Sequence, residues 1–173
     1  LGSLKDKSVL VIGAGKMGEL ALTNLCNQDL SKLYLMNRTG EKAEALAVQY
    51  KATAASFWDI KDILTTVDVC FCSVGAPHYI LDEEKILNIM QLRSGKSLLL
   101  IDISMPRNID PAVSQIPGVD LSSIDALEGV VQNNMQKRQK AISDVQSIVS
   151  AKKNEFLEKW NKLQSLNDSD FFQ

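Results

Sequence analysis

Three glycines near the start of the chain have the spacing of a phosphate-binding turn. Gly13, Gly15 and Gly18 form a Gly-x-Gly-x-x-Gly motif directly after the apolar run Ser8–Ile12. The first glycine of such a motif allows a tight turn, the second lets the backbone approach a pyrophosphate, and the third lets the next helix pack on the strand. Free N–H groups at the start of that helix favour anions. The motif predicts a dinucleotide site, although ordinary turns also produce this spacing. Its predicted members are Gly13, Ala14, Gly15, Lys16, Met17 and Gly18.

The residues that follow the second apolar run indicate which dinucleotide binds. Many NAD sites have an acidic residue here to hold the ribose 2′-hydroxyl, but this chain has Asn37-Arg38-Thr39, with Lys42 about one helical turn later. Arg38 can stack on an adenine and bind a 2′-phosphate, while Asn37 and Thr39 add neutral donors. We therefore expect NADPH as the cofactor. The alternative is that Arg38 and Lys42 are solvated charges at a helix start.

Later loops are expected to complete the cofactor site. In doubly wound sheets, ligands bind beyond the carboxyl ends of the strands. By topology alone, this rule adds six residues on the ribose and nicotinamide side of the cofactor. They are Ser73, Val74, Gly75, Ala76, Ile103 and Met105.

No side chain is assigned a catalytic role. His78, the single histidine, could act as a general acid, but it lies in a proline turn without an identifiable partner. Arg107 and Asp110 could contact a substrate, although a role within their proline-fixed turn is the simpler interpretation. We therefore predict neither a catalytic residue nor a metal site in this chain.

The three cysteines are interpreted as reduced core thiols. Cys26, Cys70 and Cys72 are odd in number, lie in apolar segments and lack Cys-x-x-Cys spacing. Cys70 and Cys72 would point to the same face of a strand, which leaves a thiol nucleophile or metal pair conceivable. No cluster of His or other Cys residues accompanies them.

Alternating strand and helix patterns must position these residues. The apolar runs predict strands at 8–12, 32–36, 53–55, 67–74, 97–103 and 119–124. Helices are expected after Gly18 and at 41–50, 57–65 and 81–92. In the first helix, Leu20, Leu22, Leu25 and Cys26 fit one apolar face. The predicted fold class is α/β, a doubly wound, mostly parallel Rossmann sheet followed by a long C-terminal α-helix.

The last fifty residues have a different pattern. From 125 to 164 there is no proline and one glycine, and apolar residues recur every seven positions. We predict a helix too long for one domain to cover, which packs on another domain or pairs with a second chain. The predicted organisation is an NADP-binding Rossmann domain at 1–124, a long helix at 125–164 and a tail at 165–173. The residues of the apolar seam are Met135, Ile142, Val149, Phe156 and Leu163.

The net charge and the lengths of the apolar runs limit the binding partners and the cellular location that we expect. The formal net charge is −2 and the pI is about 5.4, which gives no general electrostatic reason to expect binding to nucleic acid, DNA included, or to a membrane. Any contact with RNA would have to be local. No apolar run approaches the roughly 20 residues of a membrane span, and no signal peptide is evident. We expect a cytoplasmic protein. The start at Leu1 suggests a processed product or an excised part of something longer.

Several segments together resemble the cofactor domain of glutamyl-tRNA reductase. The glycine motif is common to many dehydrogenases, but the segment 101–111, Ile-Asp-Ile-Ser-Met-Pro-Arg-Asn-Ile-Asp-Pro, is more specific, as is the helix start at 125–131. Asn37-Arg38-Thr39 and the segment 73–77 also match. The resemblance extends from about Leu4 to Trp160.

This resemblance implies an NADPH-dependent enzyme that reduces glutamyl-tRNA to glutamate-1-semialdehyde for tetrapyrrole (haem and chlorophyll) biosynthesis. It implies that an N-terminal domain recognises glutamyl-tRNA and supplies a cysteine that forms a thioester, and that a C-terminal region forms a homodimer. Neither region matches this chain, and none of its cysteines matches that nucleophile. We therefore expect the chain alone to bind cofactor without catalysis. The alternatives are a shikimate-type or precorrin-type dehydrogenase domain and a non-enzymatic nucleotide-binding dimerisation module.

Overall fold

The computed structural model describes residues 3–124, 142 and 145–160. The chain divides into two compact units, Leu1–Leu127 and Glu128–Gln173. In the second unit, residue 142 and residues 145–160 are helical, so a C-terminal helix is present. The remainder of the predicted helix, the tail and the seam residues Met135 and Leu163 lie outside the described residues.

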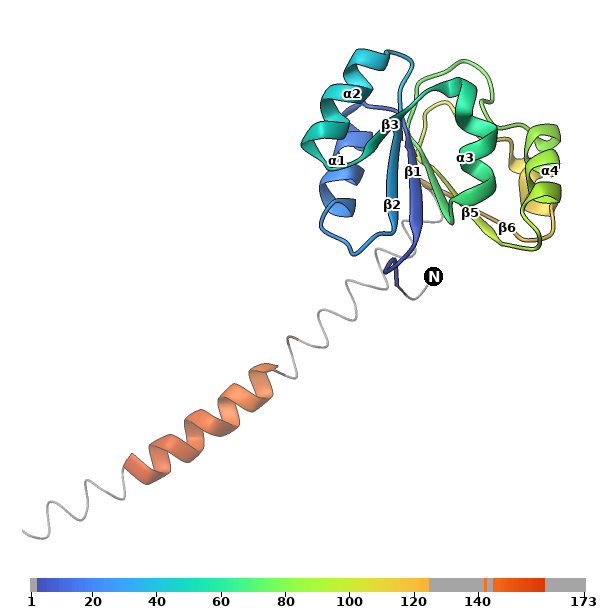
Figure 1. The fold of residues 1–173 in the computed structure, drawn as a ribbon. Helices are drawn as coiled ribbons and strands as arrows, with labels where there is room; N and C mark the ends of the chain where they lie inside the picture. Colours follow the sequence, from blue (N-terminus) through green and yellow to red (C-terminus); the bar gives the residue numbers. More distant parts are fainter. Residues whose placement is uncertain (1–2, 125–141, 143–144, 161–173) are drawn as a thin grey trace, which may run out of the picture. The chain divides into compact units, whose positions relative to one another are not determined.

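The first unit contains a six-stranded parallel sheet (Figure 1). Its spatial order is β3-β2-β1-β4-β5-β6, and all neighbouring strands pair in parallel. The chain changes direction across the sheet between β1 and β4, which is the switch point of a Rossmann fold. The predicted fold class is therefore confirmed. The strands are β1 (Ser8–Ile12), β2 (Lys32–Met36), β3 (Thr53–Ala55), β4 (Val69–Cys72), β5 (Leu98–Asp102) and β6 (Val119–Ser123).

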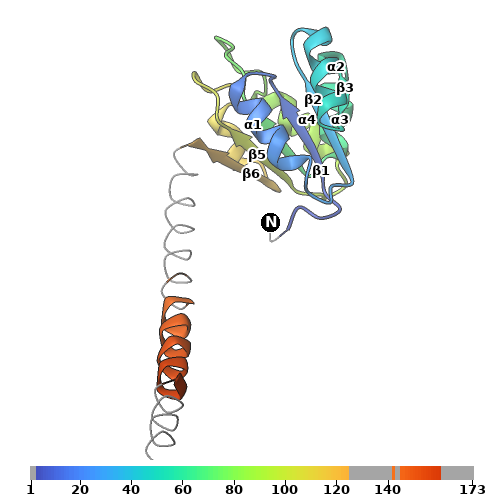
Figure 2. The same ribbon diagram turned by 90° about the vertical axis from the view of Figure 1, so that its left-hand side faces the viewer.

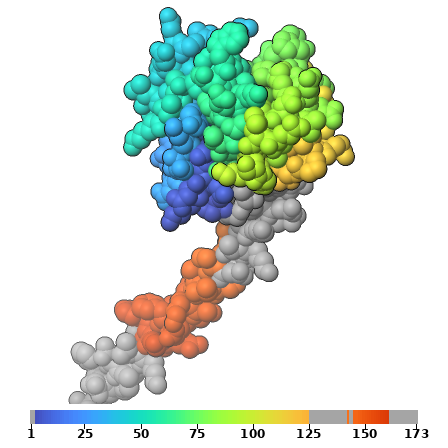
Figure 3. Space-filling view, turned by 45° about the vertical axis from the view of Figure 1, so that its right-hand side comes forward, coloured from blue at the N-terminus to red at the C-terminus, as the bar shows by residue number. Residues whose placement is uncertain are grey.

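Helices cover both faces of this sheet. The cluster on one face includes Leu22 of α1 (Lys16–Leu25) and Ala43 of α2 (Gly40–Gln49). Both helices are labelled in Figure 2. The cluster on the other face includes α3 (Ile60–Thr66), α4 (Glu83–Leu92) and the 3-10 helix η2 (Pro111–Gln115). In Figure 3 the green segment of α3 lies beside the yellow-green segment of α4, and the two helices are in contact. A second 3-10 helix, η1 (Phe57–Asp59), precedes α3.

The central strands are apolar throughout because both sides are covered. Leu10 and Ile12 of β1 belong to one cluster, whereas Val9 and Val11 belong to the other. All four are at most 1% exposed. This explains why the strands read as continuous apolar runs instead of alternating patterns.

The prediction that Leu20 shares the apolar face of the first helix is wrong. Leu20 is 55% exposed, whereas Leu22 is fully buried. The two residues are separated by about 200° around an α-helix, so they cannot share one face. The buried side of α1 is instead formed by Gly18 and Leu22, with Leu25 partly buried against the same cluster.

Arg93 makes hydrogen bonds to several chain segments near the amino-terminal ends of the strands. The residue is 2% exposed, and its guanidinium donates to carbonyl oxygens of Leu64 and Val67 at the end of α3. It also donates to the carbonyls of Lys96 and Ser97, which precede β5. Burial lowers the pKa of Arg93 from its usual value. Its donors therefore satisfy helix-end carbonyls that would otherwise be buried without partners.

Replacing Arg93 with methionine is expected to lower the free energy of unfolding by about 3 kcal/mol, because methionine fills space but donates no hydrogen bond to those carbonyls. Urea denaturation monitored by circular dichroism would measure the change. A loss below about 0.5 kcal/mol, as for an ordinary surface substitution, would contradict this role.

The cysteines offer a second test of the core. Cys70 and Cys72 are fully buried, whereas Cys26 is partly exposed. Burial raises the pKa of Cys72 to about 12 and raises the pKa of Cys70 as well. Both therefore remain protonated at neutral pH, and the thiol is a poor nucleophile.

We expect a maleimide to modify Cys26 alone in the native chain and all three cysteines after unfolding. Mass spectrometry of the labelled peptides distinguishes these positions. Native labelling of Cys70 or Cys72 at the rate of Cys26 would contradict the assignment of both thiols to the core.

Candidate functional site

The three motif glycines have different surroundings. Gly13 has a φ of +108°, and an added Cβ would overlap the Ser73 carbonyl. A Cβ on Gly18 would overlap the Gly13 carbonyl. Both positions therefore require glycine for packing and, at Gly13, for backbone conformation. At Gly15 an added Cβ meets no atom within 4 Å. Within the described residues, nothing in the protein itself requires glycine at that position.

The start of α1 has main-chain donors that no side chain caps. Gly15 is its N-cap, and no side chain makes a capping hydrogen bond there. The first main-chain bond inside the helix runs from Glu19 N to Gly15 O, at 2.9 Å. Lys16 and Met17 are exposed. Unpaired N–H groups and the helix dipole make this end suitable for an anion.

Asn37 connects the glycine loop to the turn after β2. Its Oδ1 accepts a hydrogen bond from Ala14 N at 3.3 Å, and its Nδ2 donates to the Thr39 carbonyl at 3.1 Å. The sequence predicted that this side chain adds a neutral donor beside Arg38 at the 2′-phosphate. In the structure its Oδ1 and one of its two Nδ2–H donors make bonds within the protein, and the second Nδ2–H makes no bond to the described residues.

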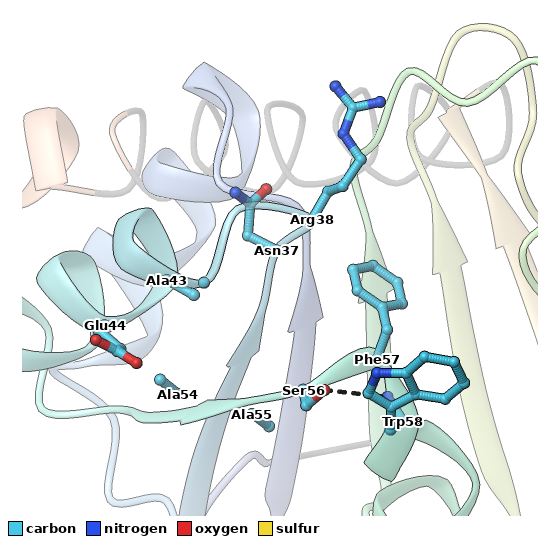
Figure 4. A pocket seen from close by; sticks show the side chains of 10 residues that line it. Asn37, Arg38, Ala43, Glu44, Ala54, Ala55, Ser56, Phe57 and Trp58 are labelled. Atoms are coloured by element: carbon cyan, nitrogen blue, oxygen red, sulfur yellow. Dashed lines mark hydrogen bonds between the residues drawn. The ribbon is translucent and has the colours of Figure 1, made fainter.

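A cleft of about 630 Å³ lies between the turn after β2 and the loop after β4. A smaller cavity of about 320 Å³ lies next to it, and Asn37, Arg38 and Phe57 line both (Figure 4). The figure shows the Arg38 side chain extending away from Ala54, Ala55 and the ring of Phe57. The larger cleft is lined by Asn37, Arg38, Thr39, Lys42, Phe57, Val74, Gly75, Ala76, Pro77, His78, Tyr79, Ile80 and Lys85.

Two cations at this cleft differ from Lys85 in their ion pairing. Among the described residues, no carboxylate oxygen lies within 4 Å of the charged nitrogens of Arg38 or Lys42. Lys85 differs, because its ammonium is 2.6 Å from Asp82 and also donates to the Ile80 carbonyl. Arg38 and Lys42 are exposed. The cleft is therefore positively charged where the chain enters α2, and it can attract a phosphate.

The structure brings together seven of the sixteen predicted cofactor residues in the larger cleft. The glycine-loop residues, Ser73, Ile103 and Met105 are not in its lining. Ser73 contacts the glycine loop through its carbonyl, the main chain of Ile103 donates to Cys72, and Met105 is 82% exposed. The seven that line the cleft are Asn37, Arg38, Thr39, Lys42, Val74, Gly75 and Ala76.

Several lining residues were missed from the sequence. Phe57 follows the carboxyl end of β3, so the rule that ligands bind beyond strand ends could have found it. Tyr79 and Lys85 lie farther from their strand, and no sequence signal marks them.

His78 and Asp110, the side chains considered for catalysis or substrate contact, have partners or surroundings typical of loop residues. His78 is exposed, and its carbonyl accepts a bond from Asn108. The Asp110 carboxylate accepts from Ala112 N at 2.9 Å and caps η2. Within the described ranges there is no group of three potential metal ligands. No helix in the same ranges is long and apolar enough to cross a bilayer.

Comparisons with curated proteins give a consistent group of relatives. The chain is 40% identical over 163 residues to the glutamyl-tRNA reductase of Thermodesulfovibrio yellowstonii, covering 94% of this chain and 38% of the relative. It is 38% identical over 162 residues to the Bacillus subtilis protein of the same name, covering 94% and 36%. The chain therefore spans less than two-fifths of the length of either relative.

Solved structures agree with this similarity. The glutamyl-tRNA reductase from Methanopyrus kandleri matches with a TM-score of 0.80 and 32% identity, over 94% of this chain and 41% of that one. The nucleotide binding domain of the Thermoplasma volcanium glutamyl-tRNA reductase matches with a TM-score of 0.59 and 18% identity, over 77% and 86%, which supports the fold alone.

A family model described as shikimate / quinate 5-dehydrogenase matches residues 1–130. This range contains the whole sheet, the glycine loop and the cleft. Because the match includes well over half of the 173 residues, the chain belongs to the shikimate / quinate 5-dehydrogenase family.

Proposed function

We propose that this chain is the NADPH-binding domain of a glutamyl-tRNA reductase. The observation that carries the proposal is the combination of an open Gly15 at an uncapped helix start with two unpaired cations beside the neighbouring strand end. Relatives of that name match along 94% of the chain, which favours this proposal over a shikimate-type or precorrin-type dehydrogenase or a non-enzymatic dimerisation module.

The residues present fit a dinucleotide phosphate. The main chain at Gly15 is unobstructed, and the first N–H groups of α1 can donate to a pyrophosphate. Arg38 and Lys42 can bind a 2′-phosphate through charge-assisted hydrogen bonds. Phe57, together with the Arg38 guanidinium, offers apolar and planar surface to an adenine.

The loop after β4 has a different role. Val74, Gly75 and Ala76 line the cleft, and an added Cβ at Gly75 would meet no atom within 4 Å. This bare main chain allows close approach by the ribose and nicotinamide side of the cofactor. When bound, NADPH supplies the hydride for reduction, and the protein contributes binding and orientation. No side chain of this chain is assigned an acid, base or nucleophile role.

The proposal extends to the complete enzyme. There the domain serves a cytoplasmic homodimer that reduces glutamyl-tRNA to glutamate-1-semialdehyde in tetrapyrrole biosynthesis. Glutamyl-tRNA binding and dimerisation belong to regions other than this chain, with residues 125–164 as the helical connection. The name of the relatives supports the part of this proposal that concerns glutamyl-tRNA, and their greater length supports the assignment of other functions to other regions.

Cofactor preference is tested by calorimetric titration of the chain with NADPH and NADH. We expect NADPH to bind at least about tenfold more tightly, which corresponds to about 1.4 kcal/mol. Arg38→Ala is expected to weaken NADPH binding by about 1.5 to 3 kcal/mol, the range for hydrogen bonds to charged groups, with little effect on NADH.

Lys96→Ala is the matched control, because Lys96 is also exposed but precedes β5 at the opposite edge of the sheet. It removes the same charge and is expected to leave both affinities unchanged. Equal losses for NADPH and NADH in Arg38→Ala would exclude Arg38 as the 2′-phosphate ligand. Absence of binding by the wild type would contradict the proposed function.

Gly15→Val tests the phosphate loop. The side chain meets no protein atom near its Cβ, so we expect a folded chain, but one whose NADPH binding is abolished because valine occupies the approach to the main chain. Circular dichroism and the same titration measure the two effects.

Gly13→Val provides the contrast, because its Cβ overlaps the Ser73 carbonyl. That variant is expected to be strongly destabilised even without ligand. If Gly15→Val binds NADPH like the wild type, the pyrophosphate does not lie on this loop.

A further inference from the structure

Asn108 is a polar side chain buried in the loop that follows β5. Its exposed fraction is 0%. Its Nδ2 donates to the carbonyls of Ala76 and His78, at 2.8 and 3.0 Å. Its Oδ1 accepts from Ala76 N at 3.4 Å. The side chain therefore pairs with both main-chain groups of Ala76, although 32 positions separate the two residues.

The main chain of Asn108 extends the same connection. Its carbonyl accepts from Ile80 N and Leu81 N, at 2.7 and 3.2 Å. Leu81 and Ile109 then form an isolated parallel bridge, in which Asp110 N donates to the Leu81 carbonyl. One residue thus contacts most of the segment from 76 to 81.

A buried carboxylate determines where Asn108 lies. Asp102, at the end of β5, is 3% exposed. Its oxygens accept from the main-chain N–H groups of Ser104, Asn108 and Ile109, each at 2.9 Å. A buried carboxylate needs such donors, so the loop is folded around it.

Ser104 binds the main chain of Val74, two residues before Ala76. Its hydroxyl accepts from Val74 N at 3.2 Å and lies 3.7 Å from the Cys72 sulfur. The N–H groups of Val74 and Ala76 are therefore both used within the protein, while Gly75 between them has open space at its Cβ position. These bonds turn the segment 74–78 into one wall of the larger cleft.

We infer that Asn108 is the positioning residue of this cleft, holding the 74–78 wall in its binding geometry before the ligand arrives. The identity of the ligand as NADPH rests on the proposed function. A wall ordered in advance costs less entropy on binding than one ordered by the ligand. Asn108 does not itself line the cleft, and it acts through the backbone of Ala76 and His78.

The test uses Asn108→Ala and Asn108→Asp in the full 173-residue chain. Alanine removes all three side-chain bonds to the wall. Aspartate keeps the size and an oxygen for Ala76 N, but it cannot donate to the two carbonyls when ionised. Because an ionised aspartate places an unpaired charge beside two buried carbonyls, both variants can lose stability. Amide exchange in the central strands β1 and β4 therefore shows for each variant whether the sheet has folded.

Two measurements are made on each variant: amide hydrogen exchange of the chain without ligand, and NADPH affinity by calorimetry. We expect exchange in residues 74–81 to accelerate at least about tenfold while exchange in α2 stays at the wild-type rate. NADPH affinity is expected to fall by about tenfold or more.

Arg93→Met is the control, because Arg93 also ties chain segments together but at the amino edge of the sheet, away from the cleft. It is expected to lower the midpoint of unfolding without selective exchange in 74–81 and without a change in affinity. This control therefore distinguishes a general loss of stability from a local loss of structure in the 74–78 wall.

Wild-type exchange in 74–81 of both Asn108 variants would overturn the inference, as would an NADPH affinity equal to that of the wild type. If the wild type binds no NADPH, the proposed function fails, whereas the exchange measurement still decides whether Asn108 holds the wall.

Discussion

The close packing of main-chain segments at Gly13 and Gly18 is the constraint on which the site depends. Neither position has room for a side chain, since a Cβ would overlap the carbonyl of Ser73 in one case and of Gly13 in the other. The loops after β1 and β4 can therefore meet directly, and α1 can begin immediately beyond β1. Its free N–H groups consequently lie at the switch point of the sheet, where doubly wound folds bind ligands.

Hydrogen bonds from buried polar side chains hold the loops around the sheet in place. Parallel strands leave irregular loops at their carboxyl ends, and the buried backbone groups of those loops need partners. Asn37 joins the glycine loop to the turn after β2, and Asp102 with Asn108 joins the loops after β4 and β5. Arg93 does the same at the opposite edge of the sheet. Hydrogen bonds to main-chain groups therefore connect the loops beside the cleft, whereas Arg38 and Lys42 have no ion pair with a carboxylate of the described residues.

Much of the fold could be predicted because it depends on local pattern. Apolar runs located the six strands, and the glycine spacing located the turn into α1. The phase of α1 was partly wrong, since Leu20 was grouped with Leu22 without regard to their positions around the helix. The Asn108 bonds could not be predicted, because they connect residues about thirty positions apart whose contact exists only after the sheet forms. Phe57 could have been found from its place after β3, whereas Tyr79 and Lys85 reach the cleft through a loop without a signal.

The most direct test of the proposed site is a crystal structure of the chain grown with NADPH at a concentration that saturates it in solution. The pyrophosphate should lie on the main chain at Gly15 and the first turn of α1, with the 2′-phosphate beside Arg38 and Lys42. A cofactor bound at another edge of the sheet, or a 2′-phosphate turned away from both cations, would contradict the proposal.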